Sequence, residues 1–250
     1  MSLLTISACI ITYNEAEMIE FILRYILSIP HITEICLIDS GSNDGTLEIL
    51  EKFSDYCKTI NFSFKMGINP FKSFGEQRNI SLDLASGEWI FSIDADETFS
   101  KGFNDILNIE CRNPNICAFR IPAITLAGDE NHYIHSGNFD PHIKVWRREG
   151  VRWVGDVHEH LIDPKGRNLH DTRAPDIIDT WNKYPNVLNK HYQLLKSNKS
   201  LIEKGKRWGE LGMIQKSADR GIPIHETSWS EWKDNCKNVF PIRQIPDEWK

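Results

Sequence analysis

Several features that would quickly assign a function are missing from this chain of 250 residues. No apolar run reaches the roughly 18 residues that a membrane-spanning helix needs. The formal net charge is −6, which argues against broad electrostatic binding to nucleic acid. The chain starts almost directly in a strand, with no basic segment or cleavage site before it. We therefore expect a cytoplasmic protein, with peripheral contact to a membrane left open.

Motifs for metal, redox and phosphate-loop chemistry are also missing. The six cysteines form no Cys-x-x-Cys pair, and Cys9 and Cys36 lie in apolar segments, so we expect buried free thiols rather than disulfides. The histidines show neither His-x-x-x-His nor His-Glu-x-x-His spacing, which speaks against a zinc site. The loop from Gly41 to Gly45 is not followed by Gly-Lys-Ser/Thr and therefore is not a P-loop.

What the sequence does contain is an alternation of strand and helix signals over its first hundred residues. We expect strands at 4–12, 34–39, 59–65 and 89–93, and helices from the Asn14 region to about 28, at 46–56 and at 74–85. Asn14 is expected to cap the first helix and Pro30 to end it. Strands that alternate with helices of this length predict βαβ units and a parallel sheet.

The pattern changes after Lys101. Strand-like segments follow at 118–126, 143–147 and 151–154, with few helical signals between them. Over 182–219 the spacing of apolar residues turns helical. An irregular tail then contains Trp229, Trp232 and Trp249. The fold class expected is therefore α/β, with a Rossmann-like, mostly parallel central sheet flanked by helices and a helical C-terminal segment. Trp146 and Trp153 are expected either in the core or as the floor of a sugar site.

The most informative segment is the apolar strand from Trp89 that stops at Asp94-Ala95-Asp96. Alternate side chains of a strand share a face, so both carboxylates would point the same way at the carboxyl end of the sheet, where α/β proteins bind ligands. Hard oxygen ligands suit Mg²⁺ or Mn²⁺, and such a metal suits a diphosphate. The triplet alone is weak, because it arises by chance roughly once in an acid-rich chain of this size.

Four segments occur in a fixed order, and a second group follows them. The first four are Ile11–Glu15, Ile38–Thr46, Gln77–Asn79 and Ile93–Glu97, and the second group comprises His142–Arg148, Val151–Trp153 and Val157–Glu159. The first set resembles family-2 glycosyltransferases of the GT-A fold. The second resembles the acceptor half of the branch that includes lipopolysaccharide-core glucosyltransferases. The resemblance implies a nucleotide-sugar-binding half at 1–100 and an acceptor-binding half at 101–165. It fades beyond about residue 165, where the residue pattern predicts a helical extension with an aromatic-rich tail at 166–250.

The resemblance also implies roles in binding the donor. Thr12 and Tyr13 would pack on the nucleotide base, and Asp39 would hydrogen-bond the base or the ribose. Arg78 would reach the nucleotide or the diphosphate, because a planar cationic fork suits both. Alternatives stay open for two residues. Asp39 at a strand end could simply cap the loop, and Glu15 could serve either helix-end electrostatics or nucleotide contact.

The metal and catalytic roles implied by the resemblance fall on later residues. Asp96 would be the main protein ligand of Mg²⁺ or Mn²⁺, Asp94 would contact the metal or the ribose, and His170 is the best-placed histidine to complete the metal shell. Glu159, with His158 beside it, occupies the place of the base that deprotonates the acceptor hydroxyl. A His-Glu pair is also a common surface dipeptide. A single displacement at the anomeric carbon would invert its configuration.

These features predict a metal-dependent, inverting glycosyltransferase. It would move a sugar from a nucleoside diphosphate sugar, with a UDP-sugar as the first choice, to a hydroxyl of a glycan or lipid-linked acceptor. One alternative is a non-catalytic nucleotide-sugar-binding module. Another is a nucleotidyltransferase, which usually has a Gly-rich phosphate loop after the first strand that is lacking here. A third is a glycosyltransferase whose acceptor is a protein or a modified nucleic acid, although the acidic balance disfavours nucleic acid.

Overall fold

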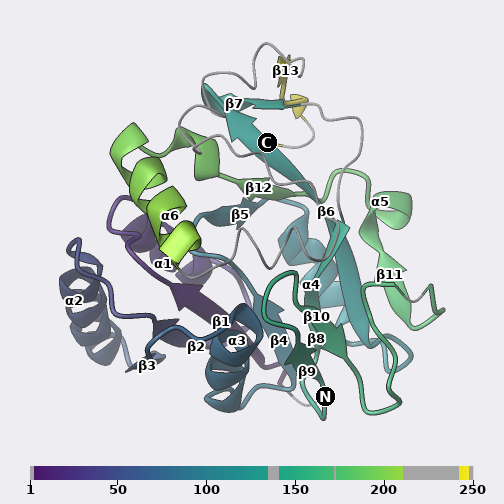
Figure 1. Ribbon diagram of the computed structural model, residues 1–250. Helices are drawn as coiled ribbons and strands as arrows, with labels where there is room; N and C mark the ends of the chain where they lie inside the picture. The colour runs from purple at the N-terminus through teal and green to yellow at the C-terminus, as the bar shows by residue number, and fades with distance from the viewer. Residues whose placement is uncertain (1–2, 135–140, 172, 211–241, 248–249) are drawn as a thin grey trace.

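The computed structural model of the chain describes residues 3–134, 141–171, 173–210, 242–247 and 250, with the backbone alone at 208–210 (Figure 1). One curled sheet runs through this part of the molecule in the strand order β13-β7-β6-β8-β4-β1-β2-β3. The strands from β4 to β3 are parallel to one another, whereas β8 is antiparallel to both β4 and β6. The structure therefore has a parallel half, as predicted, joined through β8 to a mixed half.

The parallel half repeats strand and helix in the predicted alternation. Its elements are β1 (Ile6–Thr12), α1 (Ile19–Leu27), β2 (Ile32–Asp39), α2 (Thr46–Thr59), β3 (Ser63–Ile68), α3 (Phe74–Asp83) and β4 (Trp89–Ser92). Alternate side chains of β1 pack into two hydrophobic clusters on opposite faces of the sheet. Ile6, Ala8 and Ile10 pack with α1 and α2, and Cys9 packs on the α3 side. Burial on both faces explains the nearly continuous apolar run of this strand.

Two local expectations in this half are wrong. Asn14 does not cap α1, which begins only at Ile19. Asn14 adopts a positive φ of 53° and accepts a hydrogen bond from the Asn43 backbone at 2.9 Å instead. Residues 59–62 do not start the third strand, because α2, held by the buried Cys57 in its last turn, continues to Thr59 and the chain reverses at Asn61. In both places a tertiary contact outweighs a local signal.

The mixed half confirms the strands expected after residue 101 and adds a helix that the sequence pattern did not reveal. Its elements are β5 (Glu97–Phe99), α4 (Phe103–Glu110), β6 (Ala118–Ala127), β7 (Asp129–Ile134), β8 (Pro141–Arg147), β9 (Arg152–Val154), β10 (His160–Ile162) and β11 (Ile177–Asp179). The missed helix α4 is held by its apolar face, where the ring of Phe103 stacks on Phe99 at 4.4 Å.

The C-terminal third is helical over part of the stretch 182–219 in which the sequence period turns helical. It contains α5 (Thr180–Lys183), β12 (Asn189–His191), the 3₁₀ turn η1 (Gln193–Leu195), α6 (Asn198–Glu210) and β13 (Ile242–Gln244). Strand β12 pairs with β5 and with β6, so this part of the chain joins the sheet of the preceding halves. Residues 211–219 and the tail tryptophans Trp229, Trp232 and Trp249 lie outside the described residues.

Other expectations concern thiols, tryptophans and membranes. Cys9, Cys36, Cys57, Cys111 and Cys117 are free thiols, as expected, and the sixth cysteine lies outside the described residues. Trp146 and Trp153 pack edge to face at 5.5 Å on the α3 side of the sheet. No helix within the described part of the chain is both long enough and apolar enough to cross a membrane. The division of the chain near residues 100 and 165 stays a prediction.

Candidate active site

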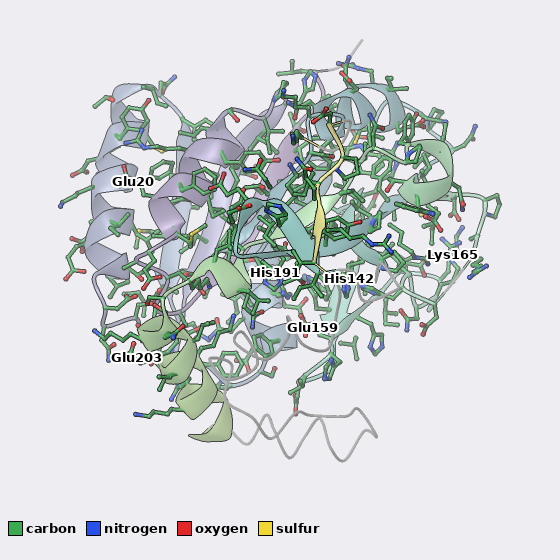
Figure 2. All side chains as sticks on the ribbon, turned by 90° about the horizontal axis from the view of Figure 1, so that it is seen from above. Glu20, His142, Glu159, Lys165, His191 and Glu203 are labelled. Atoms are coloured by element: carbon green, nitrogen blue, oxygen red, sulfur yellow. The ribbon has the colours of Figure 1, made fainter. Side chains whose placement is uncertain are left out.

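A cavity of about 640 Å³ opens at the carboxyl ends of β1 and β4. Its walls come from the loops after these strands, from α3 and β8, from the segment between β9 and β10, and from β12 and α6. Figure 2 labels four of its lining residues, His142, Glu159, His191 and Glu203, which come from these separate elements. Open α/β sheets bind ligands at this edge, so the cavity is the candidate active site.

The cavity brings together nearly all the residues predicted from the sequence. Thr12, Tyr13, Glu15, Arg78, Asp94, Asp96, Glu159 and His170 all line it. Asp39 is not among the lining residues, although its neighbour Ser40 is.

The Asp-x-Asp triplet forms a turn between β4 and β5 and is not part of the strand. The Glu97 backbone nitrogen donates to the Asp94 carbonyl at 3.1 Å, and the Asp94 backbone nitrogen donates to Glu97 Oε2 at 3.0 Å. The expectation that strand alternation places both carboxylates on one face is therefore wrong. Asp94 and Asp96 both reach the cavity, but the turn directs them to different partners.

Asp94 lies in an ion-paired row with Arg78 and Glu159. Arg78 donates from Nη2 to Asp94 Oδ1 at 2.8 Å and from Nε to Glu159 Oε1 at 2.6 Å, and its guanidinium lies 5.2 Å from the Trp153 ring centre. Burial raises the pKa of Asp94, but the charges of Arg78 and Lys144 outweigh it and hold this pKa well below the usual range. One planar cation thus fixes two carboxylates from distant parts of the sequence.

Asp96 faces cations from the C-terminal third. Its Oδ1 lies 3.3 Å from His191 Nε2, and its Oδ2 lies 2.6 Å from Lys196 Nζ and 3.8 Å from Lys204 Nζ. Burial raises the pKa of Asp96, yet Lys196, His191 and Lys204 together keep it well below the usual range. Asp96 is therefore a buried carboxylate that stays ionised.

Behind the turn, Glu97 and Lys144 form a buried support. Lys144 Nζ contacts the two carboxylate oxygens of Glu97 at 2.8 and 2.6 Å and lies 3.7 Å from Asp94 Oδ2. Asn189 of β12 donates to Glu97 Oε1 at 2.7 Å. These contacts hold the turn from two sides, so the position of Asp94 depends on β8 and β12 as well as on β4.

Asp39 shows the loop-capping geometry that the sequence left open as an alternative. It is fully buried, and it accepts hydrogen bonds from the backbone of Gly41 and Ser42 at 2.7 Å each and from Ser42 Oγ at 2.6 Å. Ser42 Oγ in turn accepts from the Asn14 backbone at 2.8 Å. Asp39 thus positions the loop that carries Tyr13, while its direct contact with a donor stays a prediction.

His170 and His191 occupy different parts of the cavity. The His170 ring accepts a hydrogen bond from the Leu161 backbone at 3.3 Å and lies 6.1 Å from the Trp153 ring, and burial lowers its pKa to about 4. His191 is the histidine in contact with Asp96. Sequence reasoning missed His191 because β12 reaches Asp96 only by pairing with β5.

The residues around Asp96 offer part of a metal shell. Within the described residues, no group of three or more His, Cys, Asp or Glu side chains could hold a metal ion by itself. Asp96 Oδ2 is buried and accepts no well-directed hydrogen bond from described residues, although Lys196 lies beside it. Asp96 and His191 would hold a divalent metal, Mg²⁺ or Mn²⁺, that takes its remaining ligands from phosphate and water.

Comparison with known proteins assigns the class. The architecture is that of the α/β GT-A fold, and the family model described as "Glycosyl transferase family 2" matches residues 7–163. The chain belongs to glycosyl transferase family 2 and is a glycosyltransferase. The matched region ends just after β10. His191 of β12, Lys196 at the end of η1 and Lys204 of α6 therefore lie beyond it.

Three individual proteins illustrate the relationship. The lipopolysaccharide core biosynthesis glycosyltransferase LpsC of Rhizobium meliloti (strain 1021) is 27% identical over 221 residues, which cover 82% of this chain and 74% of LpsC. The abequosyltransferase RfbV of Salmonella typhimurium is 27% identical over 188 residues, covering 65% of this chain and 53% of RfbV. The crystal structure of S. aureus TarS 1-349 with UDP-GlcNAc superposes with a TM-score of 0.46 and 19% identity, over 58% of this chain and 46% of that one. The chain thus spans about half the length of RfbV and of the 1-349 portion of TarS.

Proposed function

We propose that this glycosyltransferase is metal-dependent and inverting. It moves a sugar from a nucleoside diphosphate sugar, with UDP-sugar as the first choice, to a hydroxyl of a glycan or lipid-linked acceptor in the cytoplasm. The proposal rests mainly on one observation. Tyr13, the Asp94–Asp96 turn, Arg78 and Glu159 all line the same cavity. The name of LpsC supports an acceptor of the lipopolysaccharide-core type.

The donor's nucleotide is proposed to bind at the end of β1. Thr12 and Tyr13 line the cavity there, and the guanidinium of Arg207 lies 5.2 Å from the Tyr13 ring centre. An aromatic ring with a cation on it makes a stacking surface for a planar base. The Arg78–Asp94 pair lies beside Glu159 in the same cavity as Tyr13, which supports a role for Asp94 on the ribose as well as on the metal.

The metal is proposed to bind to Asp96, with His191 as the second protein ligand in place of His170. When bound, a divalent metal neutralises the charge that grows on the leaving nucleoside diphosphate. Lys144 and Glu97 hold the turn in position for this contact.

The acceptor hydroxyl is proposed to be activated by Glu159. Arg78 fixes this carboxylate through Oε1, which leaves Oε2 to take the hydroxyl proton. The acceptor oxygen then forms a bond to the anomeric carbon while the bond from that carbon to the diphosphate breaks. Because the attack is a single displacement, the configuration inverts. Trp153, which lines the cavity beside Arg78, suits the floor of a sugar site.

A thermal-shift panel of UDP, GDP and dTDP and their sugars, with and without Mn²⁺, tests this function. The correct nucleotide raises the melting temperature, and Mn²⁺ increases the shift. Asp96→Ala is expected to abolish both the Mn²⁺-dependent part of the shift and sugar transfer while the fold stays intact. A protein that binds the nucleotide but neither transfers nor hydrolyses any donor would be a binding module instead. Near-normal turnover of Asp96→Ala with metal present would refute the metal assignment.

A further inference from the structure

Lys196, Lys204 and Arg207 form a basic wall of the cavity, and the two lysines lie next to Asp96 of the acidic turn. These residues come from the end of η1 and from α6, beyond the region matched by the family model. Lys196 has a side chain only 3% exposed, whereas Lys204 is 30% exposed. The cavity therefore contains both the acids that suit a metal and cations that suit an anion.

Lys196 is held tightly among acids. Its ammonium lies 2.6 Å from Asp96 Oδ2 and 2.6 Å from each carboxylate oxygen of Glu15. Burying an ammonium is unfavourable unless opposite charges surround it, and here two carboxylates do so. The arrangement places a positive charge directly beside Asp96.

The start of α6 is anchored so that these cations stay at the cavity. The Tyr192 backbone nitrogen donates to the carbonyl of Asp96 at 2.8 Å, which ties the segment before η1 to the turn. Glu17 accepts hydrogen bonds from the Ser197 backbone at 3.0 Å and from Ser200 Oγ at 2.6 Å. The start of α6 is thereby tied to the segment between β1 and α1.

The face of α6 turned to the cavity follows helical spacing. Ser200, Lys204 and Arg207 recur at intervals of four and three residues and line the cavity, as does the exposed Glu203 next to Lys204. Lys206 is exposed and is not among the lining residues. One helix thus offers a cavity-facing lysine and an outward-facing lysine two residues apart.

We propose that Lys196 and Lys204 bind the diphosphate of the donor directly, so that the nucleoside diphosphate binds even without a divalent metal. The inference rests on the proposed function. A diphosphate beside Asp94, Asp96 and Glu15 would meet like charges, and the two lysines offset that repulsion. The diphosphate oxygens take the place of Asp96 Oδ2 as a partner of the Lys196 ammonium, which also opens Asp96 to the metal.

Isothermal titration with UDP and UMP in EDTA, using the full chain, tests the inference, with GDP/GMP and dTDP/dTMP as the alternative pairs. The wild type is expected to bind the diphosphate at least roughly tenfold more tightly than the monophosphate, as charge-assisted hydrogen bonds would provide. Lys204→Met lowers affinity for the diphosphate by roughly tenfold or more and changes affinity for the monophosphate little. Lys206→Met, the matched control on the same helix, changes neither.

Lys196→Met removes the buried cation and leaves the carboxylates of Glu15 and Asp96 next to each other, so this variant can fail to fold. In that case Lys196→Arg and Lys204→Met still test the inference. Lys196→Arg retains the preference for diphosphate over monophosphate. If the wild type binds the diphosphate only with Mn²⁺, or Lys204→Met binds it as the wild type does, the inference is overturned while the proposed function stands. If no nucleoside diphosphate binds with or without Mn²⁺, the proposed function itself fails.

Discussion

At the scale of single residues, the site consists of charged side chains that each have more than one partner. Arg78 joins Asp94 to Glu159, and Lys196 joins Asp96 to Glu15. Each carboxylate is therefore oriented by a cation from another segment of the chain. Such pairing costs desolvation energy, but it fixes the acids in the positions that binding and catalysis need.

Glu159→Gln is the residue-scale prediction. Glutamine retains an oxygen that can accept from Arg78 Nε but is not basic, so kcat is expected to fall by roughly 10²- to 10⁴-fold with little change in the Kd for UDP. Steady-state kinetics and titration measure the two quantities. Glu149→Gln, an exposed change outside the cavity, serves as the control and keeps wild-type kcat. An unchanged kcat in Glu159→Gln would exclude this residue as the base.

At the scale of elements, the docking of α3 on the segment after β9 brings Arg78 and Glu159 together. The Phe74 backbone nitrogen donates to the Asp156 carbonyl at 3.0 Å, and the Asn79 side chain exchanges two hydrogen bonds with the Trp153 backbone at 2.9 and 3.0 Å. A Cβ at Gly75 would overlap the carbonyl oxygen of Gly155. The glycine therefore permits the close approach on which the ion pair depends.

Gly75→Ala is the element-scale prediction. Overpacking at this contact is expected to destabilise the fold by about 1–3 kcal/mol and, by separating α3 from the loop, to lower kcat of the folded enzyme. Gly87→Ala is the matched control, because its Cβ would also be too close to a neighbour, 2.7 Å from Ser7 Oγ, but at the end of β1 away from the cavity. The Gly87→Ala variant is expected to lose comparable stability and to keep the wild-type kcat. Urea denaturation and kinetics on the two variants separate the effects, and equal kcat values would disprove the role of this contact.

At the scale of the whole molecule, the opposite end of the sheet is held by one buried carboxylate. Glu34 of β2 accepts hydrogen bonds from Ser7 Oγ at 2.6 Å and from Ser86 Oγ at 2.8 Å, and it pairs with Lys65 Nζ at 2.6 Å. Burial raises the pKa of Glu34, but Lys65 and these hydrogen bonds outweigh it and bring the pKa down to about 2. Three parallel strands and the turn before β4 thus meet at one charge.

Glu34→Gln is the prediction at this scale. Because the folded pKa lies below the unfolded value of 4.5, the carboxylate contributes stability above about pH 4.5 and loses it as the pH falls toward 2. The variant is expected to be about 3 kcal/mol less stable at pH 7, with a difference that narrows below pH 4.5. Glu20→Gln, which removes an exposed pair with Arg24, is the control and changes stability by about 0.5 kcal/mol or less. Denaturation curves measured from pH 3 to 7 check both, and a difference that does not depend on pH would contradict the linkage.

The sequence by itself determined the alternating strands and helices of the parallel half, the edge at which the site opens, and several of the charged and polar residues that line it. These signals are local: apolar runs mark β1 and β2, and the resemblance rests on short motifs at strand ends such as Thr12–Glu15 and Asp94–Asp96. Only the tertiary structure decided that the Asp-x-Asp triplet is a turn, that Asp39 caps its own loop, and that His191 and Lys196 reach Asp96. The reason is distance along the chain. The contacts of Asp96 with His191 and Lys196 depend on β12 pairing with β5 and β6, and no local pattern in the sequence reports that pairing.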